Sequence, residues 1–103
     1  MKIIADMNVV IIGKEISISK YVSTCIEILR RKGLKTKIHA LGTNIEGEID
    51  QLLQAIGECH EKIHEMGANR ILTSVKIASR TDRKQSIEEK IESVREKLNN
   101  KHI

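Results

Sequence analysis

The order in which strand-like and helix-like patterns follow one another constrains the fold of this chain more than any other feature. Every second residue over Lys2–Ile12 is apolar, which is typical of a strand, and a helical spacing of apolar residues follows. Over the whole chain the order is β-α-β-β-α-β and then a last helix. We predict strands at Lys2–Ile12, Lys35–Leu41, Thr43–Glu48 and Asn69–Ala78, and helices from Ser17 or Ser19 to Lys32, over Ile49–Met66, and from Ser86 to Leu98.

This order of elements predicts one topology. Two β-α-β units with right-handed crossovers interlock to give a split arrangement of strands. The expected fold class is therefore α+β, a ferredoxin-like β-α-β-β-α-β sandwich with an added C-terminal helix, in one domain over residues 1–103. Strands Lys2–Ile12 and Thr43–Glu48 should be central, with both long helices on one face. The open face should carry the polar residues Asp6, Asn8, His39, Asn44, Glu46, Ser74 and Lys76, interleaved with Ile4, Val10, Leu41 and Leu72.

A very short turn at Gly42-Thr43 is expected to join the second and third strands. With a two-residue loop, Ala40 would lie opposite Ile45 and Ile38 opposite Gly47. Ile38, Ala40 and Ile45 would then point into the core. A shift of one residue would invert this assignment, because side chains alternate between the two faces of a sheet.

The composition limits the kind of core and the partners. The chain has one Tyr and no Phe or Trp, so the core should be aliphatic. A net charge of +4 from scattered basic residues does not indicate a nucleic-acid partner. Cys25 and Cys59 lack a metal-type spacing, and the sequence shows neither a signal segment nor an apolar run of bilayer-spanning length. We therefore predict a reduced, cytoplasmic protein without membrane insertion.

Several segments together resemble one known family. They are Ser19-Lys20-Tyr21-Val22, Leu41-Gly42-Thr43-Asn44-Ile45-Glu46-Gly47-Glu48, His60, Gly67, Arg70, and Val75-Lys76-Ile77 followed by Arg80 and Arg83. They extend over nearly the whole chain, which resembles the small thiamine-binding protein family, related to hydroxymethylpyrimidine-binding proteins. The resemblance implies a ferredoxin-like homotetramer, a dimer of dimers assembled through its sheets. It also implies that thiamine or its pyrimidine moiety binds at a subunit interface, with no catalysis and no cofactor.

The chemistry of that ligand can be compared with the residues of the open face. Thiamine carries a permanent cation and an aminopyrimidine, so its site needs a carboxylate, neutral hydrogen-bonding groups and an apolar wall. Glu46 can accept from the amino group, with Ile4, Val10 and Leu72 as walls. Lys76 is expected to pair with Asp6 or Glu46. The expected ligand-binding residues are Asn8, Thr43, Glu46, Ser74, Ser19 and Tyr21, and no residue is assigned a catalytic or metal-binding role.

Alternative functions are weighed by the residues that they require. The strongest is a structural or regulatory homo-oligomer without a small ligand. His60-Glu61-Lys62-Ile63-His64 fits H-E-x-x-H, so a metal-dependent hydrolase through His60 and His64 is a weaker alternative; it lacks an evident third ligand. RNA recognition would need aromatic residues on the central strands, which are absent. Arg80, Arg83 and Lys84 could bind phosphate, although a solvated loop is the favoured interpretation.

Overall fold

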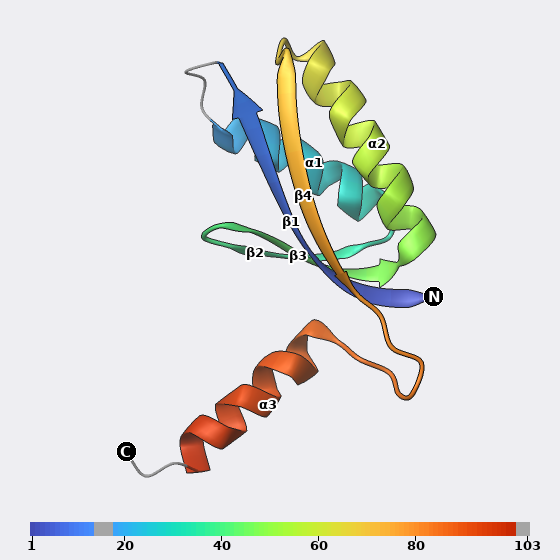
Figure 1. Cartoon of the computed structure of the whole chain (residues 1–103), viewed down its shortest axis with the longest axis vertical. Coiled ribbons are helices and arrows are strands. Elements are labelled where there is room, and N and C mark those ends of the chain that lie inside the picture. The colour runs from blue at the N-terminus through green and yellow to red at the C-terminus, as the bar shows by residue number, and fades with distance from the viewer. Residues whose placement is uncertain (14–17, 101–103) are drawn as a thin grey trace.

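The computed structural model describes residues 1–13 and 18–100 and contains one four-stranded antiparallel sheet with three helices (Figure 1). The elements in chain order are β1 (Lys2–Ile12), α1 (Ile18–Arg31), β2 (Lys35–His39), β3 (Gly42–Glu48), α2 (Ile49–Glu65), β4 (Arg70–Ala78) and α3 (Ile87–Asn100). The strand order is β2-β3-β1-β4. This is the predicted ferredoxin-like α+β fold with a C-terminal helix, and β1 and β3 are central as expected.

The sheet has one covered and one open face, and β1 shows why. Ile3, Ala5 and Met7 are at most 3% exposed and point toward α1 and α2, whereas the alternate residues point to the open face. The register carries this alternation across the sheet, with Asp6 opposite Asn44 and Lys76, and Asn8 opposite Ser74. The polar open face is thus the one that the sequence predicts.

The core between the sheet and the two helices is aliphatic apart from Tyr21. Leu29, Leu52 and Ile63 are fully buried, and Tyr21 is 2% exposed among them. Helix α1 ends as its sequence predicts. Gly33 has a φ of 83°, and the amides of Gly33 and Leu34 donate to carbonyls of the last helical turn, so the terminal carbonyls are satisfied.

The expected start of α1 is only partly tested. Ser17 lies outside the described residues. Ser19 lies inside the helix, which begins at Ile18, so Ser19 is not the N-cap. A residue within the helix already has helical φ and ψ, while an N-cap residue does not.

The β2–β3 hairpin differs from the prediction in its register. The turn is formed by Ala40 and Leu41, so that His39 lies opposite Gly42 and Ile38 lies opposite Thr43. Gly42 does not form the turn because it lies against β1: a Cβ at this position would be 2.8 Å from the backbone oxygen of Met7. The glycine permits this close approach of two strands.

The earlier turn changes the surroundings of three apolar residues. Ile38 is 62% exposed, Ala40 is exposed in the turn, and Ile45 lies opposite Thr36 instead of Ala40. Of the three residues expected in the core, only Ile45 is buried. β2 is an edge strand that a helix covers on only part of its length. The remaining side chains of β2 therefore lie in solvent.

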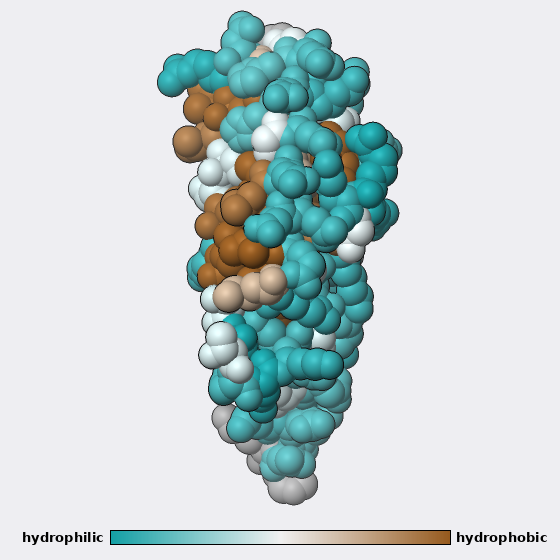
Figure 2. Space-filling view, turned by 90° about the vertical axis from the view of Figure 1, so that its right-hand side faces the viewer, coloured by the Kyte–Doolittle hydropathy of each residue, from teal (hydrophilic) through white to brown (hydrophobic). Residues whose placement is uncertain are grey.

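Helix α3 stands apart from α1 and α2 and contacts the molecule through its N-terminus (Figure 1). Ile87 is 3% exposed, while Val94 and Leu98 further along the helix are 59% and 56% exposed. The open face of the sheet also carries exposed apolar side chains, among them Val10 and Leu72. Figure 2 shows apolar patches gathered along one side of the molecule between hydrophilic regions. Among the described residues, no helix combines the length and apolarity needed to cross a membrane.

Candidate functional site

A pocket of about 280 Å³ lies where the β2–β3 hairpin separates from β1. The ladder between β1 and β3 ends at Met7 and Thr43, whereas β1 continues to Ile12 with β4 alone as its partner. The edge of β1 at Asn8–Val10 is therefore unpaired on the hairpin side. The first turns of α1 close the space from the helix side through Ile18 and Val22. We call this space the hairpin pocket; its volume is close to the lower end of typical ligand sites, about 300 Å³.

The wall of the hairpin pocket is mostly apolar, with a few polar groups. The lining residues are Met7, Asn8, Val9, Val10, Ile18, Val22, Cys25, Ile38, His39, Ala40, Leu41, Gly42 and Thr43. Asn8 Nδ2 donates to the backbone oxygen of Leu41 at 2.5 Å, which ties the turn to β1. An apolar wall with a small number of placed polar groups is the usual composition of a small-molecule site.

A carboxylate lies next to this pocket through a contact that the sequence did not predict. His39 Nε2 and Asp6 Oδ1 are 2.6 Å apart, and both side chains are partly exposed on the open face. The pair joins the end of β2 to β1 across β3. It places a negative charge beside a pocket that already contains the imidazole, so cationic or hydrogen-bond-donating ligands find an acceptor there.

The structure brings two of the six predicted site residues together. Asn8 and Thr43 both line the hairpin pocket. Thr43 is 3% exposed and shares the helix-covered face with Met7 and Ile45, whereas Asn8 is on the open face. The odd position of Thr43 in β3 gives it the parity of the core residue Ile45, so Thr43 reaches the pocket from the helix-covered side and Asn8 from the open side.

The other four predicted site residues lie elsewhere in the single chain. Ser74 neighbours Asn8 on the open face but is outside the pocket lining. Ser19 is exposed on α1, and Tyr21 is buried in the core. Glu46 is 8% exposed, on the open face of β3. A ligand that touches all six residues at once is therefore not accommodated by one protomer.

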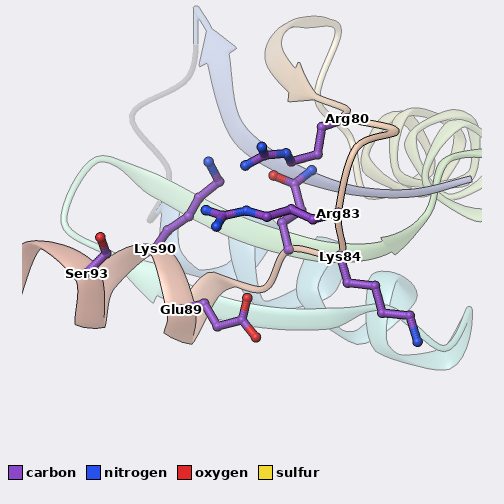
Figure 3. Close-up of a pocket in the computed structure, with 7 residues that line it drawn as sticks. Arg80, Arg83, Lys84, Glu89, Lys90 and Ser93 are labelled. Carbon is purple, nitrogen blue, oxygen red and sulfur yellow. The ribbon is translucent and has the colours of Figure 1, made fainter.

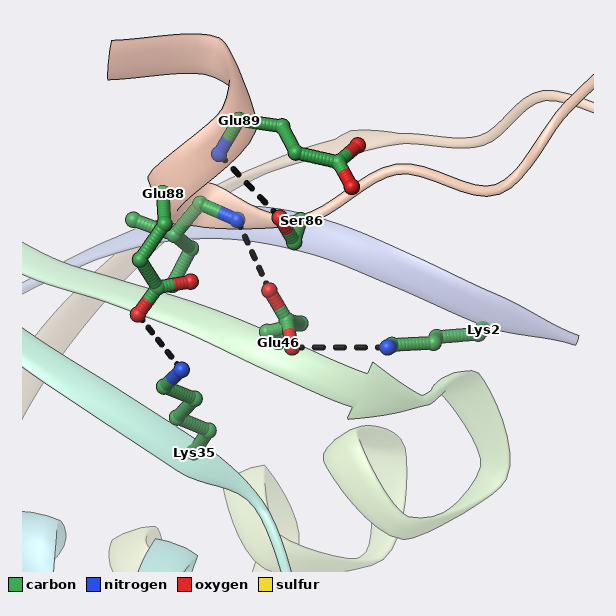
Figure 4. Close-up of polar contacts among 7 residues, drawn as sticks. Lys2, Lys35, Glu46, Ser86, Glu88 and Glu89 are labelled. Carbon is green, nitrogen blue, oxygen red and sulfur yellow. Dashed lines mark hydrogen bonds and ion pairs between the residues drawn. The ribbon is translucent and has the colours of Figure 1, made fainter. Parts of the chain in front are cut away.

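Glu46 has partners of its own, drawn in Figure 4. Its Oε1 accepts a hydrogen bond of 2.7 Å from the backbone amide of Ile87, the first residue of α3. Its Oε2 lies 3.4 Å from the Lys2 ammonium. A carboxylate at a helix N-terminus satisfies an amide that has no partner inside the helix and interacts favourably with the helix dipole. Glu46 thus anchors α3 to the sheet.

Two further contacts support the same attachment. The Ser86 hydroxyl accepts from the Glu89 amide at 3.1 Å, which is the first half of the predicted capping box. Lys35 Nζ lies 2.5 Å from Glu88, and hydrogen bonding to this ammonium holds the pKa of the Glu88 carboxyl below its usual value.

The predicted ion pair of Lys76 is not formed. Within residues 1–13 and 18–100, Lys76 pairs with neither Asp6 nor Glu46, because His39 and Lys2 occupy those carboxylates.

The two histidines of the H-E-x-x-H segment each have a protein partner. His60 Nε2 is 2.7 Å from the Thr73 hydroxyl, and His64 Nδ1 donates to the Ala68 carbonyl at 2.7 Å. Their ring centroids are 6.3 Å apart. In the described part of the chain, no three His, Cys, Asp or Glu residues are grouped so that they could hold a metal ion. These contacts connect α2 to β4 and to the loop before it.

The two cysteines are buried in the hydrophobic core. Cys25 and Cys59 are 1% and 2% exposed and are both free thiols. Cys59 Sγ lies 3.8 Å from the Cys25 carbonyl. The hydrogen bond with Cys25 and burial both raise the pKa of Cys59, so its thiol stays protonated.

Five lining residues of the hairpin pocket are outside the predicted ligand site: Ile18, Val22, Ile38, His39 and Leu41. No local pattern marks them, because the pocket exists only where the hairpin turn, the edge of β1 and the start of α1 meet. The register of the hairpin decides which of these residues reach it. Leu41 is 80% exposed in this turn, but the sequence predicts it within a strand and so gives no signal for the pocket.

Comparisons with known proteins agree with this fold. The sequence matches the family described as thiamine-binding protein over residues 5–95. The UPF0045 protein sll0230 of Synechocystis sp. is 44% identical over 100 residues, covering 97% of this chain and 83% of that protein. The UPF0045 protein MJ1052 of Methanocaldococcus jannaschii is 35% identical over 95 residues, covering 92% and 94%.

Solved structures of similar proteins have the same fold. The crystal structure of the M. jannaschii protein MJ1052 has a TM-score of 0.84 and 35% identity, covering 92% of this chain and 97% of that chain. A candidate thiamine biosynthesis/salvage protein of Thermotoga maritima has a TM-score of 0.77 at 20% identity, covering 91% and 99%, which shows a shared fold. The chain therefore belongs to the thiamine-binding protein family, and its relatives include the UPF0045 proteins.

Proposed function

We propose that this protein binds thiamine or its hydroxymethylpyrimidine moiety without chemical conversion, at an interface between subunits. The match to the thiamine-binding family over residues 5–95 is the observation that carries the proposal. The hairpin pocket supplies the physical support, since it is the one of the described pockets in which a mostly apolar wall is combined with an amide, an imidazole and a hydroxyl. An aminopyrimidine needs this combination of donors, acceptors and flat apolar contact.

The site residues are Asn8, Thr43 and His39 in this proposal, with the Asp6 carboxylate beside them. Asp6 and His39 offer negative charge and an acceptor on the open-face side, which suits the thiamine cation or the amino group. The Thr43 hydroxyl lies on the helix-covered side of the pocket. Glu46 lies outside the hairpin pocket of its own protomer, where it anchors α3.

A second copy of the chain would complete the site. Leu41, Ile38, Ile18 and Val10 line the hairpin pocket and are 80%, 62%, 53% and 42% exposed. Such a concentration of exposed apolar side chains around one pocket is typical of a surface that another subunit covers. A small domain also gains stability by burying more surface in this way. We infer a homotetramer, a dimer of dimers that uses the open sheet faces, located in the cytoplasm.

Calorimetric titration with thiamine and with hydroxymethylpyrimidine tests the proposal, together with sedimentation to measure assembly size. We expect saturable binding with a fixed ratio per subunit. Thr43→Val keeps the shape of the side chain and removes its hydroxyl, so binding should weaken by about tenfold, the value of one neutral hydrogen bond. Thr24→Val is the matched control, because Thr24 is outside the hairpin pocket and its hydroxyl donates to the Lys20 carbonyl of its own helix.

A well-folded oligomer that takes up neither ligand would refute the proposal. The exposed apolar surface would then favour a structural or regulatory homo-oligomer, for which the same residues are the interface. The hydrolase alternative would require a stoichiometric metal at His60 and His64 whose removal by a chelator abolishes an activity.

A further inference from the structure

A second pocket, of about 330 Å³, lies between the loop after β4 and the first turns of α3. Its lining residues are Arg80, Arg83, Lys84, Gln85, Glu89, Lys90 and Ser93. It is separate from the hairpin pocket: β4 ends opposite Ile4, near the start of β1, whereas the hairpin pocket begins at Met7 and extends along Asn8–Val10. We call it the basic pocket.

Three cationic side chains converge in the basic pocket. Figure 3 shows Arg80, Arg83 and Lys90 directed into the same space, while the Lys84 ammonium and the Glu89 carboxylate point away from it. Arg80 is paired with Asp82. In the part of the chain that the structure describes, neither Arg83 nor Lys90 has a carboxylate partner within ion-pair distance.

Like charges that share a pocket repel one another, weakly here because Arg83 and Lys90 are exposed to solvent, and a bound anion would relieve that repulsion. The Arg80–Asp82 pair is local to the loop, and hydrogen bonding to Arg80 lowers the pKa of Asp82 to about 2, so the pair stays ionised at neutral pH. Asp82 does not line the pocket. The Arg83 charge also lowers the pKa of Asp82 by attraction over a longer distance, while the N–H donors of Arg83 and Lys90 stay available to a bound anion.

The elements that carry these side chains are held in place. Gln85 is 8% exposed and donates from Nε2 to the Ala78 carbonyl at 3.1 Å, which ties the loop to the end of β4. The amide of Ile87 is bonded to Glu46. Lys90 and Ser93 are three residues apart on α3 and so lie on the same side of the helix. A binding site on anchored elements loses less conformational entropy when a ligand binds.

We propose that the basic pocket binds a phosphate group, either inorganic phosphate or a phosphate monoester. A guanidinium offers two parallel N–H donors to phosphate oxygens, an ammonium adds a compact charge, and the Ser93 hydroxyl adds a neutral donor. A carboxylate offers two acceptor oxygens and one negative charge, whereas a phosphate dianion offers more acceptor oxygens and a second negative charge to the cationic groups. The permanent cation of thiamine is disfavoured in this pocket, so the site takes a ligand different from that of the hairpin pocket.

Titration of the full chain with inorganic phosphate and with glycerol 3-phosphate, followed by phosphorus NMR and calorimetry at low ionic strength, tests the proposal. The double variant Arg83→Gln/Lys90→Gln should bind at least about tenfold more weakly, because two charge-assisted contacts are lost. The matched control is Arg95→Gln/Lys97→Gln, which removes the same two kinds of charge from exposed positions of α3 and should change affinity less than about twofold.

The outcomes separate clearly. Tighter binding of the monoester identifies an organic phosphate as the ligand, and equal binding identifies phosphate itself; both support the site. Absence of saturable binding at millimolar concentrations overturns the proposal. So does equal weakening in the two double variants, because a general loss of positive charge would then explain the effect. Circular dichroism melting of both variants checks that the fold is intact.

Discussion

Replacing Glu46 tests whether its carboxylate anchors α3 to the sheet. The Glu46 side chain is 9% exposed, accepts from the Ile87 amide at 2.7 Å and lies 3.4 Å from the Lys2 ammonium. The substitution Glu46→Ala removes the carboxylate and leaves the amide of Ile87 without its partner, while Ile87 itself remains 3% exposed. We expect loss of stability concentrated at the attachment of α3.

The expected magnitude follows from the two contacts. A hydrogen bond between an amide and a charged acceptor contributes about 1.5–3 kcal/mol, and the loss of one partner also leaves the other unsatisfied. The Lys2 pair adds about 0–1 kcal/mol, since the Lys2 side chain is 52% exposed and solvent screens it. The free energy of unfolding should therefore fall by roughly 1.5–4 kcal/mol in total. Glu46→Gln keeps an acceptor oxygen and loses the charge at the helix N-terminus, so it should cost about 1 kcal/mol.

Urea unfolding at fixed protein concentration measures these differences. With a slope of about 2 kcal/mol per molar urea, in the middle of the typical range, Glu46→Ala should lower the midpoint by roughly 1–2 M. Glu65→Ala is the matched control: its carboxylate is 3.6 Å from Lys62 on the surface of α2, and we expect less than about 0.5 kcal/mol. Hydrogen exchange should show the amide of Ile87 and its neighbours losing protection in Glu46→Ala but not in Glu65→Ala.

Equal midpoints for Glu46→Ala and Glu65→Ala would refute the assignment of Glu46 as the anchor of α3. The thiamine titration of Glu46→Ala then gives independent information. If α3 loses protection while binding per subunit is unchanged, Glu46 is a structural residue. If binding is lost with the fold and assembly intact, the carboxylate acts at the ligand itself.

Three further predictions rest on other parts of the structure. Gly42→Ala places a methyl group 2.8 Å from a backbone oxygen of β1 and should destabilise the protein by about 1–3 kcal/mol in urea unfolding, whereas Gly57→Ala, on the exposed side of α2 with nothing within 4 Å, should stabilise it by up to about 1 kcal/mol. A Gly42→Ala protein that is as stable as the unmodified protein would contradict the hairpin register. The pKa of Asp82 is lowered to about 2, so its pair with Arg80 contributes to folding stability above the unfolded pKa, and this contribution is lost as the pH falls through the folded pKa. NMR titration of Arg80→Gln should show the pKa of Asp82 returning toward 3.8. The buried Cys59 thiol, whose pKa is raised, should resist a thiol reagent in the native protein and react fully in denaturant.

The spacing of apolar residues along the sequence determined the helices, the strands and which face of the sheet is covered. The alternation in β1 and β4 predicts which of Asp6, Asn8 and Ser74 face the open side, because side-chain direction in a strand depends only on parity. The C-terminal end of α1 was likewise predictable, since the cap at Gly33 is a local backbone requirement. The family resemblance then indicated the class of ligand.

Contacts between distant residues decided the rest. The role of Gly42 depends on the Met7 carbonyl of another strand, so a glycine that indicated a turn was in fact a point of close approach. Glu46 is bonded to an amide 41 residues away, and Asp6 to an imidazole 33 residues away. Such pairings carry no periodic signal in sequence. The hairpin pocket and the basic pocket exist only because the fold brings together side chains from separate elements, whose packing the local pattern does not encode.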